Sequence, residues 1–231
     1  MKTLIHIGQH KTATTSIQAY LRKNRAALQE QGIFIPEGLA GHDSASHFAL
    51  NIYCLDPGRQ STMKSKMIRE HGIEYLDELR RVLPDEIRAT YELARKHDCT
   101  RVLWSNEGLY LLNSITEHKR LLHLFAPYSD SIEIICCFRN IWAFKKSYTT
   151  QLERQGYPLS GDPASHQNLG DGSWLLDQRR KRLLLATVFT KCTYFQYDAI
   201  DNIRAFMKAI RMKPISATTE YRINTSRRRD P

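Results

Sequence analysis

The sequence predicts an α/β fold with a central, mainly parallel sheet flanked by helices. Apolar runs of strand length alternate along the chain with segments whose leucines and aromatic residues recur at helical spacing, an alternation typical of strand–helix–strand units. The chain has 231 residues, 42% of them hydrophobic, and it contains no internal repeat and no Pro/Gly/Ser-rich linker. We therefore expect one domain covering residues 1–231, because a chain of this length can bury a core of its own.

Four apolar runs are predicted as strands and seven segments as helices, on hydrophobic spacing and on the residues that bound them. The strands are Thr3–Ile7, Arg101–Ser105, Ile132–Phe138 and Thr193–Gln196, and the helices are Thr15–Glu30, Glu74–Leu83, Asp85–His97, Ile115–Phe125, Trp142–Gln155, Leu175–Thr190 and Ile200–Ile210.

Two long segments between these elements are predicted to be irregular. Pro36–Ile73 and Gly156–Ser173 are rich in Gly, Pro, Asp, Ser and His. Long loops in a compact domain are usually functional, so we expect both to be lids or binding loops.

The charge balance favours an anionic partner. Lys and Arg number 34 against 24 Asp and Glu, a net charge of +10, which attracts anions without identifying them. Two basic runs stand out, residues 178–182 and 227–229. The first is equally compatible with a solvated helix face.

Several other classes of site are not expected. No stretch approaches the roughly 18 apolar residues of a membrane span, so we predict no transmembrane segment and a cytoplasmic location. His6 and His10 lie in a strand-to-loop setting rather than on one helix face, which argues against a metal site. The cysteines form no CxxC pair and are expected to be buried free thiols; they are Cys54, Cys99, Cys136, Cys137 and Cys192.

The loop after the first strand has the chemistry of a phosphate-binding loop. It reads GQHKTATTS from Gly8 to Ser16. Gly8 allows a tight turn, the following N–H groups and the helix N-terminus favour an anion, and Lys11 adds a full charge. The hydroxyls of Thr12, Thr14, Thr15 and Ser16 are further donors, although such residues also serve simply as helix caps.

This loop departs from the ATP-binding pattern G-x-x-x-x-G-K-[ST]. The lysine comes three residues after Gly8, Ala13 stands where a second glycine is expected, and no aspartate ends a later apolar strand to support magnesium. A phosphate ester that binds without metal therefore fits better than a nucleoside triphosphate.

The stretch HIGQHKTATTSIQAYL resembles the 5′-phosphosulfate-binding loop of sulfotransferases that use 3′-phosphoadenosine 5′-phosphosulfate (PAPS). Four of five positions of the family pattern Lys-[Ser/Thr]-Gly-Thr-Thr match Lys11 to Thr15, with Ala13 in place of the glycine. Ala13 is strained if its φ is positive and harmless if it is helical. The resemblance implies a P-loop-like three-layer fold and a PAPS site formed by residues 10–16: His10, Lys11, Thr12, Ala13, Thr14, Thr15 and Ser16.

A second element resembles the 3′-phosphate site of the same family. Arg139 ends the apolar strand SIEIICCF and Ser147 follows eight residues later on the next predicted helix. A guanidinium binds phosphate through two donors, and the serine adds a hydroxyl from the same side. The alternative is an arginine that pairs with a neighbouring carboxylate and a serine that is merely exposed.

The C-terminal stretch YRINTSRRRD carries a weaker likeness, at Arg222, Asn224 and Ser226. The resemblance implies that Arg227 or Arg228 closes over the 3′-phosphate. A solvated basic tail over residues 222–231 is the alternative.

The implied reaction is metal-independent sulfuryl transfer from PAPS to a hydroxyl or amine, leaving adenosine 3′,5′-bisphosphate. Lys11 would stabilise the leaving phosphate. The first candidate for the general base is Glu107, which otherwise serves as a first-turn acid of a helix; His47 and His10 are second candidates. Tyr157, His166 and Trp174 in the long loops are expected to shape the acceptor pocket, for a saccharide, a lipid or a small metabolite.

Two other functions stay open. A nucleotide kinase with a degenerate P-loop would share the fold and would require ATP and magnesium. A basic nucleic-acid-binding protein would use a contiguous basic face and would have no particular need for Lys11 or Arg139. The paired loops favour the enzyme, so no nucleic-acid partner is expected.

Overall fold

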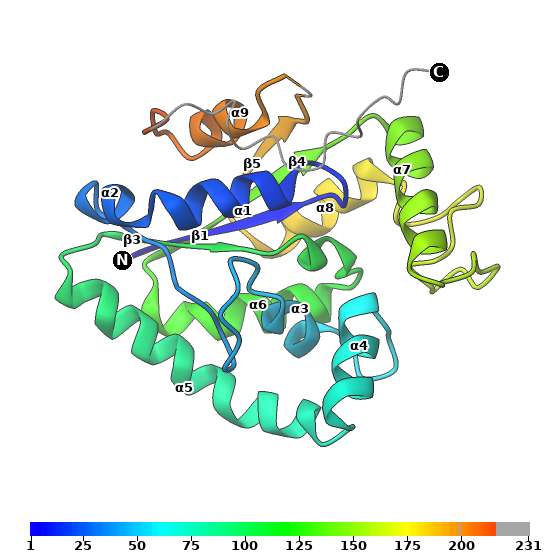
Figure 1. The fold of residues 1–231 in the computed structure, drawn as a ribbon, viewed down its shortest axis with the longest axis horizontal. Coiled ribbons are helices and arrows are strands. Elements are labelled where there is room, and N and C mark those ends of the chain that lie inside the picture. The colour runs from blue at the N-terminus through cyan, green and yellow to red at the C-terminus, as the bar shows by residue number, and fades with distance from the viewer. Residues whose placement is uncertain (199, 216–231) are drawn as a thin grey trace.

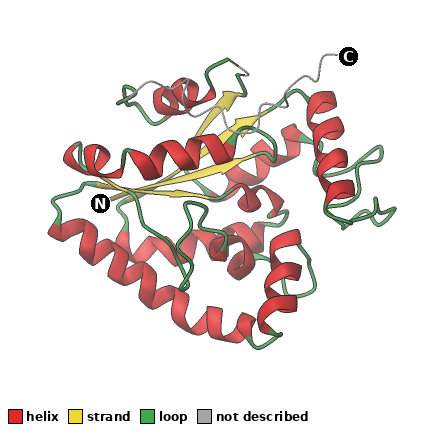
Figure 2. Cartoon of the chain, in the orientation of Figure 1, coloured by secondary structure: helices red, strands yellow, loops and turns green. Residues whose placement is uncertain are grey.

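A five-stranded sheet, all parallel, forms the centre of the computed structural model, which describes residues 1–198 and 200–215 (Figures 1 and 2). The strand order is β2-β3-β1-β4-β5. This confirms the predicted α/β class with its central parallel sheet. The strands are β1 (Lys2–Gly8), β2 (Ile33–Phe34), β3 (Arg101–Ser105), β4 (Ser131–Phe138) and β5 (Lys191–Gln196).

Helices cover both faces of the sheet. Figure 1 shows α1, α2 and α9 on one side and α3, α5 and α6 on the other. The helices are α1 (Thr14–Lys23), α2 (Arg25–Glu30), α3 (Ala49–Cys54), α4 (Thr62–His71), α5 (Tyr75–Lys96), α6 (Ile115–Phe125), α7 (Ile141–Arg154), α8 (Gln178–Val188) and α9 (Asn202–Ala209), with short 3-10 helices η1 (Glu107–Leu111) and η2 (Ala126–Tyr128).

Alternating side chains of the central strands supply two separate cores. In β1, Leu4 packs with the residues of α1 and α9, whereas Ile5 and Ile7 pack with those of α5 and α6. Leu103 of β3 and Ile135 of β4 face the same side as Leu4. A strand buried on both faces must be apolar on both, and this is why these strands appear in the sequence as continuous apolar runs.

The register of β1 determines where the functional loops meet. β1 pairs with β3 so that His6 lies opposite Ser105, and with β4 so that Gly8 lies opposite Cys137. Because all strands are parallel, the residues that follow β1, β3 and β4 lie at one edge of the sheet. Ligands of open α/β sheets bind at this carboxyl edge.

The predicted helix Thr15–Glu30 is wrong in its continuity. The chain forms α1 and α2 instead, interrupted at Asn24, whose backbone φ is −100° and ψ is 17°. The Asn24 side-chain amide donates to the Tyr20 carbonyl at 2.9 Å. Asparagine competes in this way with regular helical hydrogen bonding and so favours helix ends.

The prediction is also wrong at Pro84. The predicted helices Glu74–Leu83 and Asp85–His97 form a single helix in the structure. α5 runs through this proline for 22 residues. An interior proline costs a helix about 3 kcal/mol. A continuous buried stripe offsets this cost; it consists of Leu79, Leu83, Ile87, Tyr91 and Ala94.

The two long segments that were predicted to be irregular differ in secondary structure. Residues 36–73, predicted to be irregular, contain α3 and α4, whereas residues 156–173 contain no helix or strand, as predicted. β2 was not predicted, because two residues are too few to show a periodic pattern.

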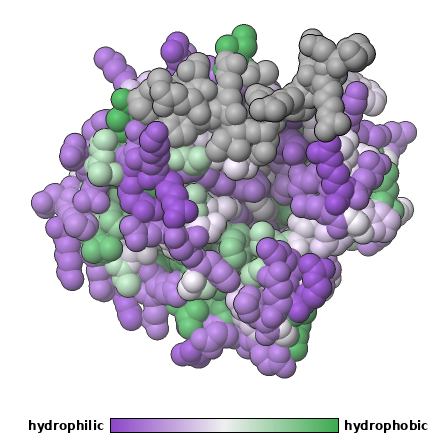
Figure 3. Space-filling view, in the orientation of Figure 1, coloured by the Kyte–Doolittle hydropathy of each residue, from purple (hydrophilic) through white to green (hydrophobic). Residues whose placement is uncertain are grey.

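The surface seen in Figure 3 is mostly hydrophilic, with small separate hydrophobic areas. None of the helices within residues 1–198 and 200–215 is both long enough and apolar enough to cross a membrane. The five cysteines are free and four of them are buried, as predicted.

Candidate functional site

The loop between β1 and α1 has a backbone that is suited to anions. Lys11 and Ala13 both adopt left-handed backbone conformations, with φ of 66° and 55°. Left-handed residues within such a loop turn successive N–H groups toward one side. In the described part of the chain, the N–H groups of Lys11, Ala13, Thr14 and Thr15 have no hydrogen-bond acceptor. They are therefore available to a ligand.

Ala13 has a positive φ, which is the strained one of the two backbone conformations that the sequence allows. It is the N-cap of α1 with φ 55° and ψ 31°, and no side chain caps the helix there. Its carbonyl accepts from the N–H groups of Ser16 and Ile17 at 3.0 and 3.1 Å. A left-handed alanine costs about 1–2 kcal/mol.

Gly8 is required for close packing. A Cβ at this position would lie 2.5 Å from Thr14 Cγ2 and 2.8 Å from Thr12 Oγ1. Gly8 is not among the glycines with positive φ. The absence of a side chain therefore lets the start of α1 lie directly against the end of β1.

The hydroxyl residues of the loop divide into buried and exposed sets. Thr12 is fully buried, and its hydroxyl donates to the Gln9 carbonyl at 2.6 Å, which holds the turn together. Thr14 and Ser16 are also buried, whereas Lys11 and Thr15 are exposed. Lys11 has no ion-pair partner among residues 1–198 and 200–215. A cation and a hydroxyl thus lie at the open side of the loop.

Arg139 lies directly against this loop. Its Nη1 donates to the Lys11 carbonyl at 2.8 Å, although the two residues are 128 apart in the chain. Its guanidinium carbon lies 4.9 Å from the centroid of the Tyr197 ring. No carboxylate of the described residues forms an ion pair with Arg139, so the alternative of a simple structural ion pair does not apply there.

The backbone of Arg139 is held by two glutamines. The Arg139 N–H donates to Gln9 Oε1 at 2.9 Å, and Gln178 Nε2 donates to the Arg139 carbonyl at 2.6 Å. Ser147 lies about two turns into α7 and is partly exposed. It forms no hydrogen bond with Arg139.

A hydrogen bond connects Glu107 to α1, the helix that follows the loop. It begins η1 just beyond β3, and its Oε2 accepts from Gln18 Nε2 of α1 at 3.0 Å. The Ser105 hydroxyl lies 3.4 Å from Gln18 Nε2 and 2.9 Å from His6 Nδ1. This network places a carboxylate at the carboxyl edge of β3, one strand away from the loop.

His47 and His10 are both buried neutral side chains. His47 Nδ1 accepts from the Ser105 N–H at 3.0 Å, while Nε2 lies 3.4 Å from the Pro36 carbonyl. Both nitrogens are thus occupied. The His10 ring lies 5.1 Å from Tyr148, and its Nδ1 has no partner. Burial lowers the pKa of each to about 4, helped at His10 by the charge of Lys11.

The sequence did not single out several residues that build the site. Gln9 and Tyr197 directly follow β1 and β5, so the strand-end rule would have found them. Gln18, Gln178 and Asn202 come from helices, where no local pattern marks them. Asn202 Nδ2 donates to the Thr12 carbonyl at 2.7 Å and so ties α9 to the loop.

The predicted C-terminal site residues lie in a part of the chain that the structure does not describe. Arg222, Asn224, Ser226, Arg227 and Arg228 fall outside the described residues. Within residues 1–198 and 200–215 no group of three or more His, Cys, Asp or Glu side chains is arranged to hold a metal ion.

Comparison with known proteins relates the chain to others by fold. No protein-family model matches it, and no curated protein matches it in sequence. It is similar in structure to the sulfotransferase from Alicyclobacillus acidocaldarius, with a TM-score of 0.55 and 13% identity over 95% of this chain and 85% of that chain. This likeness shows a shared fold.

Two further solved structures match over similar lengths. One is the tunicamycin resistance protein of Deinococcus radiodurans, with a TM-score of 0.48 and 12% identity over 94% of this chain and 99% of that chain. The other is the sulfotransferase domain from the curacin biosynthetic pathway, with a TM-score of 0.46 and 8% identity over 94% of this chain and 75% of that chain.

Relieving the strain at Ala13 is expected to stabilise the protein. Ala13→Gly should raise the free energy of unfolding by about 1 kcal/mol, because glycine has no Cβ to oppose a left-handed φ. The matched control is Ala89→Gly on the exposed face of α5, which should lower it by about 1 kcal/mol. Urea denaturation measures both, and equal destabilisation by the two substitutions would contradict the left-handed assignment.

Buried histidines are expected to make the fold sensitive to acid. Burial lowers the pKa of His6 and His118 to about 3 and that of His10, His47 and His166 to about 4. The unfolded chain, with histidine pKa values of about 6.5, therefore binds more protons, and the free energy of unfolding falls as the pH falls from about 6.5 toward 4.

The expected slope is about 1 kcal/mol per pH unit for each such histidine. Urea denaturation between pH 7 and pH 4.5 measures it. His47→Asn, which keeps an acceptor for the Ser105 N–H, should reduce the slope by about one proton. The exposed His123→Gln should leave it unchanged, and a stability independent of pH in this range would refute the account.

Proposed function

We propose that this protein transfers a sulfuryl group from PAPS to a hydroxyl or amine of an acceptor. The observation that carries the proposal is the contact between the Arg139 guanidinium and the Lys11 carbonyl. Two separately predicted anion-binding elements lie within one hydrogen bond of each other at the carboxyl edge of the sheet. The shared fold with a sulfotransferase is compatible with this function.

The residues present fit a nucleotide that carries two phosphate groups. Lys11, the unpartnered N–H groups of the loop and the hydroxyls of Thr14, Thr15 and Ser16 would hold the 5′-phosphosulfate, with His10 and Thr12 supporting the turn. Arg139 and Ser147 would hold the 3′-phosphate, and Arg227 of the tail would close over it. PAPS, when bound, supplies an activated sulfuryl group whose departure leaves a phosphate.

The residues of the candidate site then have defined tasks. Lys11 and the N–H groups neutralise charge on the 5′-phosphate, where negative charge increases during transfer. Glu107 accepts the proton of the acceptor, and Gln18 fixes the direction of its carboxylate. His47 holds Ser105 at the end of β3, because both of its nitrogens are occupied, and so positions Glu107 rather than acting as the base.

Nucleotide binding tests this proposal most simply. Calorimetric titration should give tighter binding of adenosine 3′,5′-bisphosphate than of ATP with magnesium. Lys11→Ala and Arg139→Ala should each weaken bisphosphate binding by about tenfold or more, since a hydrogen bond to a charged group contributes about 1.5–3 kcal/mol.

Glu107→Gln is the control within the site. It should leave the affinity for the bisphosphate unchanged while abolishing transfer once an acceptor is supplied. Preference for ATP with magnesium would favour a kinase, and binding that is indifferent to both Lys11→Ala and Arg139→Ala would refute the assigned site.

A further inference from the structure

A cluster of mostly buried side chains that can donate hydrogen bonds includes His10 of the loop between β1 and α1. We call it the donor cluster. Its members come from the loop after β1, the loop before α4, η1, the segment 156–177 and α8; they are His10, Arg59, Tyr110, His166, Trp174 and Lys181.

Ring and charge contacts connect these residues to one another. Burial, together with the electrostatic influence of the neighbouring His10 and Arg59, lowers the pKa of His166 to about 4. The Arg59 guanidinium lies 5.0 Å from the centroid of Trp174. Lys181 Nζ lies 4.9 Å from the centroid of Tyr110 and 5.7 Å from that of Trp174. The donor cluster is therefore continuous from the neighbour of Lys11 to α8.

Lys181 is a buried cation without an anion. Its side chain is 1% exposed, and its Nζ donates to the Leu112 carbonyl. No carboxylate of residues 1–198 and 200–215 forms an ion pair with it. Burial, with the charge of Arg59 added, lowers the pKa of Lys181 to about 7. A lysine in this setting gains from any anion that comes within contact.

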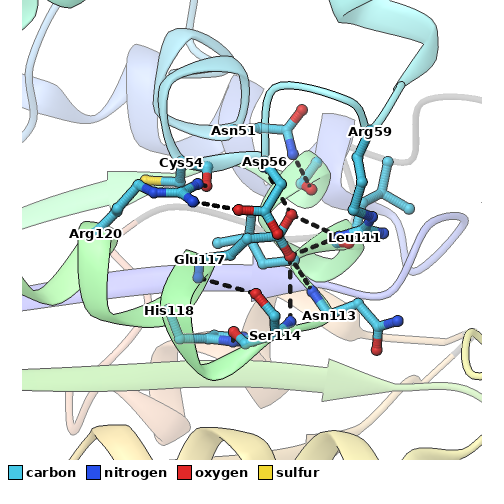
Figure 4. Close-up of polar contacts among 12 residues, drawn as sticks. Asn51, Cys54, Asp56, Arg59, Leu111, Asn113, Ser114, Glu117, His118 and Arg120 are labelled. Carbon is cyan, nitrogen blue, oxygen red and sulfur yellow. Dashed lines mark hydrogen bonds and ion pairs between the residues drawn. The ribbon is translucent and has the colours of Figure 1, made fainter. Parts of the chain in front are cut away.

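The carboxylate that pairs with Arg59 already accepts hydrogen bonds at both oxygens. Glu117 is 0% exposed and accepts from Arg59 Nη1 at 2.5 and 2.7 Å. It also accepts from the backbone N–H groups of Asp56, Asn113 and Ser114 at 2.9, 2.6 and 3.2 Å (Figure 4). Arg59 and Glu117 cancel each other, so the charge of Lys181 is the one left uncompensated.

Four members of the cluster have buried polar atoms that find no partner among residues 1–198 and 200–215. They are Tyr110 Oη, Trp174 Nε1, His166 Nε2 and His10 Nδ1, on side chains that are 0, 5, 5 and 8% exposed. Native proteins leave few such groups unsatisfied. The Trp174 N–H can only donate, and the two cations can only donate. An acceptor oxygen would satisfy the Trp174 N–H, and Tyr110 Oη and, in the matching tautomer, the two imidazole nitrogens can also donate to it.

We propose that the donor cluster binds a carboxylate of the acceptor, so that the substrate is an acidic molecule with a hydroxyl or amine beside its carboxylate. This inference rests on the proposed function. One uncompensated positive charge matches the single negative charge of a carboxylate better than the double charge of a phosphate ester.

The position of α8 relates this binding site to the transfer site. Gln178 of α8 donates to the Arg139 carbonyl. Lys181 follows three residues later, and residues three apart are neighbours on a helix surface. His10 is the neighbour of Lys11 in the chain and a member of the donor cluster. A carboxylate held by Lys181 and Trp174 would orient the rest of the acceptor toward the loop.

Acetate is the probe, and acetamide is its neutral counterpart of equal size. Both are titrated at constant ionic strength into the full chain saturated with adenosine 3′,5′-bisphosphate, so that the phosphate-binding loop is occupied. Carbon-13 NMR of labelled lysine side chains follows the pKa of Lys181, whose signal is identified by its loss in Lys181→Met.

Acetate should raise the measured pKa of Lys181 by about one unit, a tenfold gain in proton affinity, and acetamide should leave it unchanged. The apparent affinity for acetate is followed by thermal unfolding, and it should fall about tenfold in Lys181→Met. The control is Lys96→Met at the exposed end of α5, which should leave that affinity unchanged.

Trp174→Phe keeps an aromatic six-membered ring and removes the N–H donor with the rest of the indole, so it is the second test if Lys181→Met fails to fold. It should weaken acetate binding by about fivefold. Equal effects of acetate and acetamide, or full acetate binding in the Lys181 or Trp174 variant, would overturn the inference. The titration repeated without nucleotide separates this outcome from failure of the proposed function, which is judged by bisphosphate binding alone.

Discussion

The hydrogen bond between the Arg139 guanidinium and the Lys11 carbonyl joins the two halves of the candidate site. It depends on the parallel pairing of β1 with β4, because the register that puts Gly8 opposite Cys137 brings the following loops together. The Gln9 N–H extends this pairing by donating to the Cys137 carbonyl at 3.0 Å, and Gln9 Oε1 then receives the Arg139 N–H. A one-residue slip of β4 would exchange its faces and separate the two halves.

The loop between β1 and α1 is held in an unfavourable conformation by the structure around it. Left-handed backbone at Lys11 and Ala13 costs about 1–2 kcal/mol each. Contacts on three sides oppose this cost: the Thr12 hydroxyl bonds to Gln9, Asn202 bonds to the Thr12 carbonyl, and α1 packs against Gly8. The N–H groups therefore have a fixed direction before any anion arrives, which is the arrangement that electrostatic stabilisation requires.

Much of the fold was predictable because the central strands are apolar on both faces. β1, β3, β4 and β5 lie within two residues of their predicted bounds. The errors arose where packing overrides local preference, as at Pro84, or where an element is too short to show a period, as in β2. Asn24 divided a helix through a side-chain hydrogen bond that hydrophobic spacing does not reveal.

The site was predictable only where it follows a strand. Lys11, Arg139 and Glu107 come shortly after β1, β4 and β3, and strand ends are where ligands of this fold bind. Gln18, Gln178 and Lys181 reach the site from helices, so their contacts depend on how those helices pack. His47 is a candidate base by its residue type alone. Only the structure reveals that both of its ring nitrogens are occupied.

The most direct test of the account measures which phosphate each half of the site recognises. Dissociation constants for adenosine 3′,5′-bisphosphate, adenosine 5′-monophosphate and adenosine 3′-monophosphate are compared in the parent protein, Lys11→Ala and Arg139→Ala. If Lys11 binds the 5′-phosphate and Arg139 the 3′-phosphate, Lys11→Ala loses the preference for the bisphosphate over the 3′-monophosphate. Arg139→Ala then loses the preference for the bisphosphate over the 5′-monophosphate. Variants that weaken all three nucleotides equally would contradict a site built from two separate phosphate-binding elements.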